Sequence, residues 1–121
     1  MRIFHLHEQD WQAEPAYNTV ARRFFPWDGI EAAEWGGAWV QVLPGETSTP
    51  HHHDENEVFF VVAGGGLVRH GAEQYRIGYG SSMYMEPGVD HCVVNDGPTP
   101  LVFVSMWWDG PVRTTPEPDP A

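Results

Sequence analysis

The sequence has no lysine and only one cysteine, Cys92. Without lysine, the chain cannot use a Schiff base or a lysine general base. A lone cysteine excludes an intramolecular disulfide, and nothing in the cysteine usage indicates an oxidising compartment. We interpret Cys92 as a small core residue rather than a nucleophile or a thiolate ligand.

Basic residues are few, and long apolar runs are missing. Six arginines stand against 17 acidic residues, which leaves a formal net charge of -11. A negative surface repels phosphate backbones, so we expect no nucleic-acid partner. No apolar run approaches the roughly 20 residues that span a bilayer, and the first residues do not read as a signal peptide. We therefore expect a cytoplasmic protein with no membrane partner.

What the sequence does contain is a series of short runs rich in Val, Phe, Tyr and Trp. Glycine and proline turns separate these runs, and residues 70–73 resemble a hairpin turn. Runs of this length and spacing predict an all-β sandwich or barrel. The expected strands are 38–43, 57–62, 67–70, 74–77, 82–85, 91–94 and 101–108.

The 121 residues are enough for one domain. We expect residues 35–108 to form the barrel and residues 1–34 to form an irregular segment that packs on it. Residues 109–121 contain four prolines and few apolar residues. This composition predicts an extended or disordered tail, or a linker.

The stretch from Pro50 to Glu57 contains three adjacent histidines. Because side chains alternate faces along a strand, His51, His53 and Glu57 can point toward one centre while His52 faces away. Two imidazoles and a carboxylate suit zinc, iron, nickel or manganese, and His91 is the natural fourth ligand. The alternative is a surface loop of solvated histidines.

Glycines at fixed distances extend this pattern into two motifs. The first, G-x5-H-x-H-x3-E-x6-G, begins at Gly45 and ends at Gly64. The second, G-x5-P-x-G-x2-H-x3-N, runs from Gly80 to Asn95, except that Glu86 replaces the proline. Both resemble the cupin motifs, and the resemblance covers residues 35–108. It implies a double-stranded β-helix, or jelly roll, with one divalent metal on His51, His53, Glu57 and His91.

Strand alternation also suggests residues around the metal. Glu57, Phe59 and Val61 should point inward. Trp39 and Gln41 share one face of their strand, so Gln41 either orients a substrate near the metal or faces solvent. On 101–108, either Phe103, Ser105 and Trp107 or the alternate set lines the cavity, because the sequence does not fix the register.

Four further polar residues have two interpretations each. Tyr84 is a candidate proton donor and Arg69 a candidate anion clamp, but either can be a barrel-wall residue instead. The Arg22-Arg23 pair can close over the mouth of the barrel or pair with surface acids. We therefore name Gln41, Tyr84 and Arg69 as the candidate catalytic residues.

Three functions remain open, because a cupin fold alone does not name a reaction. The first is a zinc cupin catalysing a non-redox reaction on a small molecule. The stretch 51–66, the strand 102–110 and the proline-rich tail resemble the cupin of hydrazine synthetases. That resemblance implies rearrangement of an O-aminoacyl hydroxylamine ester to form an N–N bond, with a methionyl-tRNA-synthetase-like partner domain. The second is an iron-dependent dioxygenase, and the third a ligand-binding cupin without turnover. We also expect a homodimer, with the aromatic N-terminal segment against a partner's sheet.

Overall fold

A computed structural model describes residues 1–26 and 34–110 of the chain. Within these two ranges, one 3-10 helix, η1 (Glu8–Asp10), comes before nine strands. The strands are β1 (Gln12–Glu14), β2 (Thr19–Phe25), β3 (Trp35–Val42), β4 (Asn56–Ala63), β5 (Gly65–His70), β6 (Glu73–Gly78), β7 (Ser82–Met85), β8 (His91–Val94) and β9 (Leu101–Trp108). The described part of the chain holds no helix with the length and hydropathy needed to cross a membrane.

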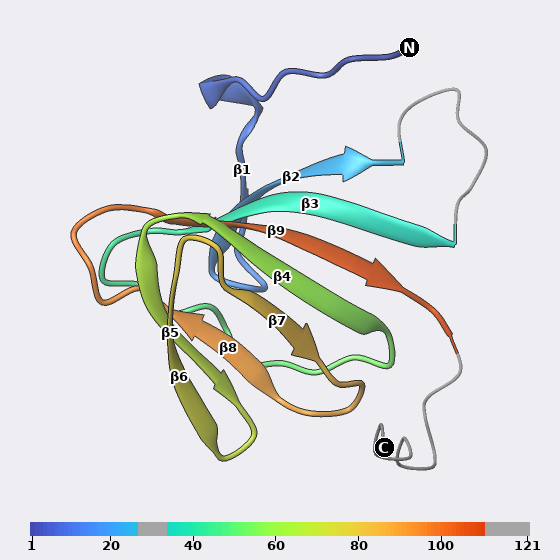
Figure 1. The fold of residues 1–121 in the computed structure, drawn as a ribbon. Helices are drawn as coiled ribbons and strands as arrows, with labels where there is room; N and C mark the ends of the chain where they lie inside the picture. The colour runs from blue at the N-terminus through green and yellow to red at the C-terminus, as the bar shows by residue number, and fades with distance from the viewer. Residues whose placement is uncertain (27–33, 111–121) are drawn as a thin grey trace.

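The strands form two antiparallel sheets (Figure 1). The larger has the order β1-β2-β3-β9-β4-β7, and the smaller has the order β6-β5-β8. The apolar core lies between them, because both sheets supply its buried side chains. Those from the larger sheet include Val42, Phe59 and Phe103, and those from the smaller include Val68 and Val93. The predicted all-β jelly roll is confirmed.

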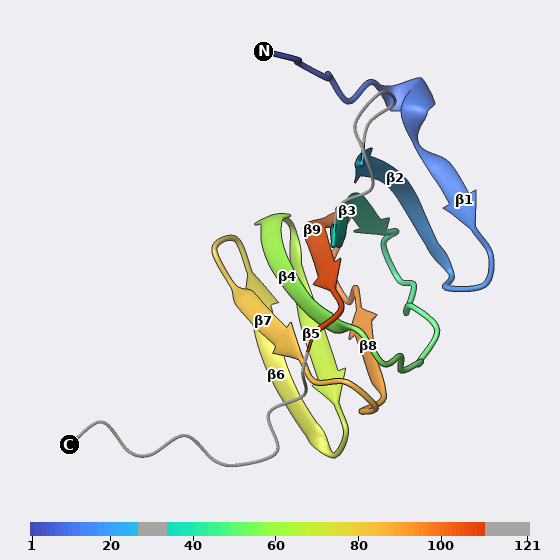
Figure 2. The same ribbon diagram turned by 90° about the vertical axis from the view of Figure 1, so that its right-hand side faces the viewer.

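The N-terminal segment is more regular than the sequence indicated. Residues 12–14 and 19–25 are strands that extend the larger sheet beyond β3, as Figure 2 shows. The description of residues 1–34 as irregular is therefore corrected. The sequence pattern does not predict β2, because a register shift between Arg23 and Phe25 interrupts the alternation of buried and exposed residues. Residues 27–33 and the tail from 111 lie outside the described residues.

Two of the tight connections between strands contain a glycine with positive φ, Gly64 and Gly71. Residues 71 and 72 connect β5 to β6, which confirms the predicted hairpin. Gly64 has φ +75°, and a Cβ atom there would lie 2.3 Å from the carbonyl oxygen of Pro100. Only glycine therefore allows the β4–β5 turn to approach the start of β9 so closely.

Asn95, the last residue of the second motif, fastens the loop between β8 and β9. It is 1% exposed, and its Nδ2 donates hydrogen bonds to the carbonyl oxygens of Val42 and Thr99 at 2.9 and 2.8 Å. Its Oδ1 accepts from the N–H of Gly97 at 2.9 Å. This asparagine therefore holds the loop against the end of β3 and plays a structural role.

Candidate metal centre

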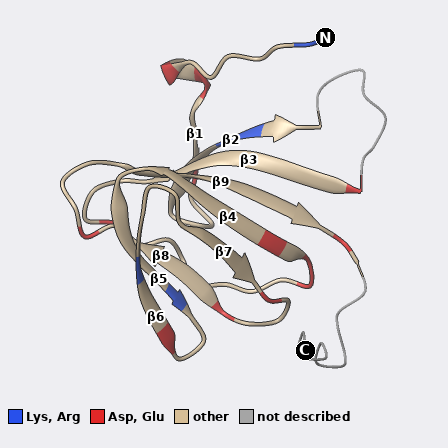
Figure 3. Ribbon diagram, viewed as in Figure 1, with Lys and Arg blue, Asp and Glu red and all other residues tan. Residues whose placement is uncertain are grey.

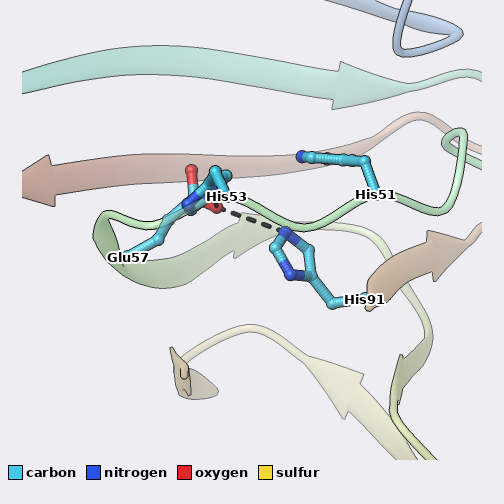
Figure 4. Close-up of side chains that lie close together, drawn as sticks. All are labelled: His51, His53, Glu57 and His91. Atoms are coloured by element: carbon cyan, nitrogen blue, oxygen red, sulfur yellow. Dashed lines mark hydrogen bonds and ion pairs between the residues drawn. The ribbon is translucent and has the colours of Figure 1, made fainter. Parts of the chain in front are cut away.

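Two segments far apart in sequence bring the four predicted ligands together. His51 and His53 lie in the extended segment before β4, Glu57 lies in β4, and His91 begins β8. The backbones of His51 and His91 exchange two hydrogen bonds, of 3.2 and 2.9 Å, which aligns the two segments. One ligand atom from each residue lies within 4.8 Å of the others. Figure 4 shows the four side chains gathered around one centre.

Each histidine ring of this group is anchored on its Nδ1 side. Nδ1 of His51 lies 2.9 Å from the carbonyl oxygen of Thr49, and Nδ1 of His53 lies 3.0 Å from that of Glu55. Nδ1 of His91 lies 3.3 Å from the carbonyl oxygen of Val89. A carbonyl oxygen only accepts, so each Nδ1 carries the proton. A ring that holds its single proton on Nδ1 presents the lone pair of Nε2, the arrangement that metal-binding histidines use.

Glu57 supplies a carboxylate that stays ionised despite its burial. Burial alone would raise its pKa, but the neighbouring side chains of His91, Ser105 and His53 outweigh that effect and lower the pKa below its usual value. The Ser105 hydroxyl donates to Oε2 at 2.6 Å, and Oε1 lies 3.0 Å from Nε2 of His53. The serine therefore fixes one carboxylate oxygen and leaves the other facing the histidines.

The donor set fits a bound cation. When Nδ1 carries the proton, Nε2 of His53 and Oε1 of Glu57 are both acceptors, and such a pair at 3.0 Å needs a positive species between its atoms. Nε2 of His91 is 3.3 Å from the same oxygen. Among the described residues it is the one buried side-chain nitrogen or oxygen without a hydrogen-bond partner. Three imidazole nitrogens and a carboxylate are ligands that zinc and other first-row divalent metals accept.

The four residues lie at the wall of a cavity of about 290 Å³ between the sheets and the β1–β2 hairpin. Its inner wall is largely apolar and comes mainly from β3, β4 and β9. The predicted inward positions of Glu57, Phe59 and Val61 on β4 are confirmed by their burial. On β9, the set with Ser105 faces the cavity. The lining side chains of these three strands are Ala38, Val40, Glu57, Phe59, Phe103, Ser105 and Trp107.

Gln41 lies outside this cavity, which corrects the proposed position near the metal. Ala38 and Val40 line the cavity, so Trp39 and Gln41 point to the outer face of β3. Trp39 instead borders a separate groove beside Phe24. The sequence did not show which face of β3 points inward, because the strand carries apolar side chains on both faces.

Tyr84 and Arg69 also lie away from the cavity, as the barrel-wall interpretation expected. The Tyr84 hydroxyl donates to Oδ1 of Asn56 at 2.6 Å, and its ring is half exposed. Nε of Arg69 donates to Oε1 of Gln74 at 2.9 Å on the smaller sheet. Neither residue is among those that line the metal cavity. Their positions therefore give no support to a catalytic role.

The two residues expected to face away from the metal do so. His52 is exposed, and its Nδ1 lies 2.6 Å from Oδ1 of Asp90 rather than near the other histidines. Cys92 is buried with its thiol free and is not part of the ligand cluster.

The β1–β2 hairpin contributes a residue that the sequence did not single out. The ring of Tyr17 lies 4.9 Å from that of His51, measured between centroids, and it lines the cavity. The N–H of Thr49 donates to the Tyr17 carbonyl oxygen at 2.8 Å, which ties the hairpin to the segment carrying His51. No local pattern in the sequence signals this contact, because it joins segments more than 30 residues apart.

Known proteins show the same architecture. The family model described as "Cupin domain" matches residues 38–107. A cupin 2 conserved barrel domain protein from Salinispora arenicola is 28% identical, with a TM-score of 0.81 over 90% of this chain and 89% of that one. The plu4264 protein from Photorhabdus luminescens is also 28% identical, with a TM-score of 0.80 over 88% and 87% of the two chains.

A longer curated protein contains a related segment. Mannose-1-phosphate guanylyltransferase ManC from Salmonella typhimurium is 33% identical over 92 residues, which are 74% of this chain. The same match covers 19% of that enzyme, so the chain spans about a fifth of its length. The motifs, the two-sheet barrel and the match to the family model agree, and the chain belongs to the cupin family.

Proposed function

We propose that this cupin is a metal-dependent enzyme acting on a small molecule. The observation that carries the proposal is the convergence of His51, His53, Glu57 and His91, with each histidine Nδ1 near a backbone carbonyl oxygen. A ligand set held this rigidly favours binding of a metal over a chance grouping of polar residues. A bound divalent ion would supply Lewis acidity toward a substrate oxygen.

The cavity supports a small substrate and a partly dry site. Its volume of about 290 Å³ lies near the lower end of the range of ligand pockets. Phe59, Phe103 and Trp107 line it and keep water away from much of the wall. Polar interactions in such a site are stronger than in open solvent. These features support turnover of a small molecule more than they support binding of a macromolecule.

Elemental analysis of untagged protein purified without chelator tests the proposal. We expect about one equivalent of a divalent metal per chain. The double variant His51→Ala/His91→Ala should lose it, because two of the four ligands are removed. His52→Ala is the matched control, since His52 is adjacent in sequence but faces Asp90 outside the cluster. Equal metal content in all three proteins, or none in the wild type after reconstitution, would contradict the proposal.

The identity of the metal separates the finer proposals. We propose zinc ahead of iron, together with a non-redox rearrangement, on the strength of the sequence resemblance to hydrazine synthetase cupins. The test is incubation of the zinc-loaded protein with an O-aminoacyl hydroxylamine ester and mass spectrometry for an N–N product. Iron as the resident metal, with oxygen uptake in the presence of a substrate, would favour the dioxygenase instead. A metal-loaded protein that binds ligands without turnover would favour the sensing role.

A further inference from the structure

One arginine that has no acidic partner among the described residues lines the metal cavity. Arg23, on β2, is the single lysine or arginine among the described lining residues. Among hydrogen bonds, ion pairs and ring contacts in the described part of the chain, its side chain forms one, with an aromatic ring, although the protein carries 17 acidic residues. Arg76, by contrast, forms two hydrogen bonds of 2.8 Å with Asp96. The guanidinium of Arg23 therefore keeps its donors available for a ligand.

The ring beneath Arg23 is a cavity-lining indole. The Cζ atom of Arg23 lies 5.1 Å from the centre of the Trp107 ring, within the range of a cation–π contact. The indole lies across Gly36 on β3, where an added Cβ would be 2.7 Å from the ring. Gly36 thus leaves room for the indole to reach toward β2. A guanidinium resting on an aromatic face retains N–H groups at its edge, and those groups match the two oxygens of a carboxylate.

Strand pairing places this arginine and Glu57, one of the four metal ligands, on the same sheet. Arg23 pairs with Ala38, and Ala38 pairs with Ser105 on β9. Strands in a sheet are about 4.8 Å apart, so the backbones of Arg23 and Ser105 are separated by about 10 Å. The Ser105 hydroxyl in turn donates a hydrogen bond to Glu57, and Trp107 is the cross-strand partner of Glu57. A small molecule in the cavity therefore has Arg23 within reach at one end and the ligand cluster at the other.

The other charged residues of the cavity would oppose an anion. Glu14, Glu55 and Glu57 also line it, and the chain as a whole carries a net charge of -11. An anionic ligand would need a compensating cation, and Arg23 is the side chain in place to supply one. We propose that the substrate carries a carboxylate, which Arg23 binds from its position on Trp107. This inference rests on the proposed function, which places the other end of the substrate at a bound metal.

Binding of small carboxylates and their neutral amides tests the assignment. The probes are benzoate with benzamide, malonate with malonamide, and inorganic phosphate, measured by calorimetry on metal-loaded and metal-free protein. We expect at least one acid to bind about tenfold more tightly than its amide. Arg23→Gln should abolish that preference. Arg22→Gln is the matched control, because Arg22 is exposed on the same strand and borders the groove beside Phe24, as Arg23 also does, but does not line the metal cavity.

Each outcome of these binding measurements supports or contradicts the proposed carboxylate site. A preference for the acid that survives in Arg23→Gln, or its absence in the wild type, would overturn the proposal. Phosphate binding more tightly than both acids would overturn the choice of a carboxylate. A wild-type protein that takes up no metal contradicts the proposed function alone, since an Arg23-dependent preference in metal-free protein would still support the carboxylate site.

Discussion

At the scale of single residues, the candidate centre is organised by groups just outside the four ligands. Backbone carbonyl oxygens place a proton on Nδ1 of each of the three histidines. The Ser105 hydroxyl, 2.6 Å from Oε2, orients the Glu57 carboxylate. The carbonyl contacts cannot be removed by substituting a side chain. Ser105 is therefore the residue through which this outer support can be tested.

We expect Ser105→Ala to weaken metal binding by about tenfold to a hundredfold, because Glu57 loses the partner that fixes its orientation. Metal competition with a chromogenic chelator measures the change. Ser48→Ala is the control: Ser48 is also buried and lines the cavity, but its hydroxyl accepts from the N–H of Val93. That variant should lose about 1 kcal/mol of stability and keep its metal affinity. Equal losses of affinity in both variants would show that Ser105 acts only through stability.

The sequence predicted three of the ligands because His51, His53 and Glu57 are close together in an extended segment, where alternation can place them on one side. The fourth, His91, was identified from its place at the head of a later strand and in the second motif. It failed for Gln41 because β3 has apolar residues on both faces and its alternation does not reveal the inner one. Tyr17 could not be found, since the contact depends on how the β1–β2 hairpin folds back onto residue 49. The sequence left the Arg22-Arg23 pair with two interpretations, the mouth of the barrel or surface ion pairs, because the contact of Arg23 with Trp107 depends on sheet register.

At the scale of elements, the predicted strands were close to those observed because glycine and proline mark most of their ends. The observed β7 and β8 have the same bounds as predicted, and β4 is longer by one residue at each end. The strands β1 and β2 were missed because one is three residues long and the other contains adjacent arginines and a register shift. Turn glycines were informative, but they do not all serve the same physical purpose.

Two motif glycines separate backbone conformation from close contact. Gly64 and Gly80 both have positive φ, but a Cβ at Gly64 would collide with the Pro100 carbonyl oxygen whereas none at Gly80 would meet an atom within 4 Å. We expect Gly80→Ala to lower the free energy of unfolding by about 1 kcal/mol. Gly64→Ala should cost about 3 kcal/mol, because the collision adds to the backbone strain. Urea unfolding measures both, and equal costs would contradict the assigned role of the close contact.

At the scale of the whole molecule, charge and apolar surface are separated. Strands β3 and β9 carry no acidic or basic residue, and Figure 3 shows the charged residues mostly at strand ends, on connections and on the smaller sheet. The outer face of β3 and β9 is therefore uncharged, although Asp10 and Arg22 border the groove beside Trp39. On β4, the strand beside β9 in the same sheet, Phe60 and Val62 are 41% and 37% exposed. Large exposed apolar residues in one area are typical of an interaction surface.

We propose that two copies of the chain associate through this outer face, since the charges that would make them repel each other lie elsewhere. Light scattering at micromolar concentration should give twice the chain mass of 13.6 kDa. Phe60→Asp should produce a monomer with unchanged metal content, because Phe60 points away from the core. Tyr79→Asp is the control: Tyr79 is 86% exposed and lies between β6 and β7, so its substitution should leave the dimer intact. A wild-type monomer would overturn the proposal, and a dimer that withstands Phe60→Asp would place the interface on another face.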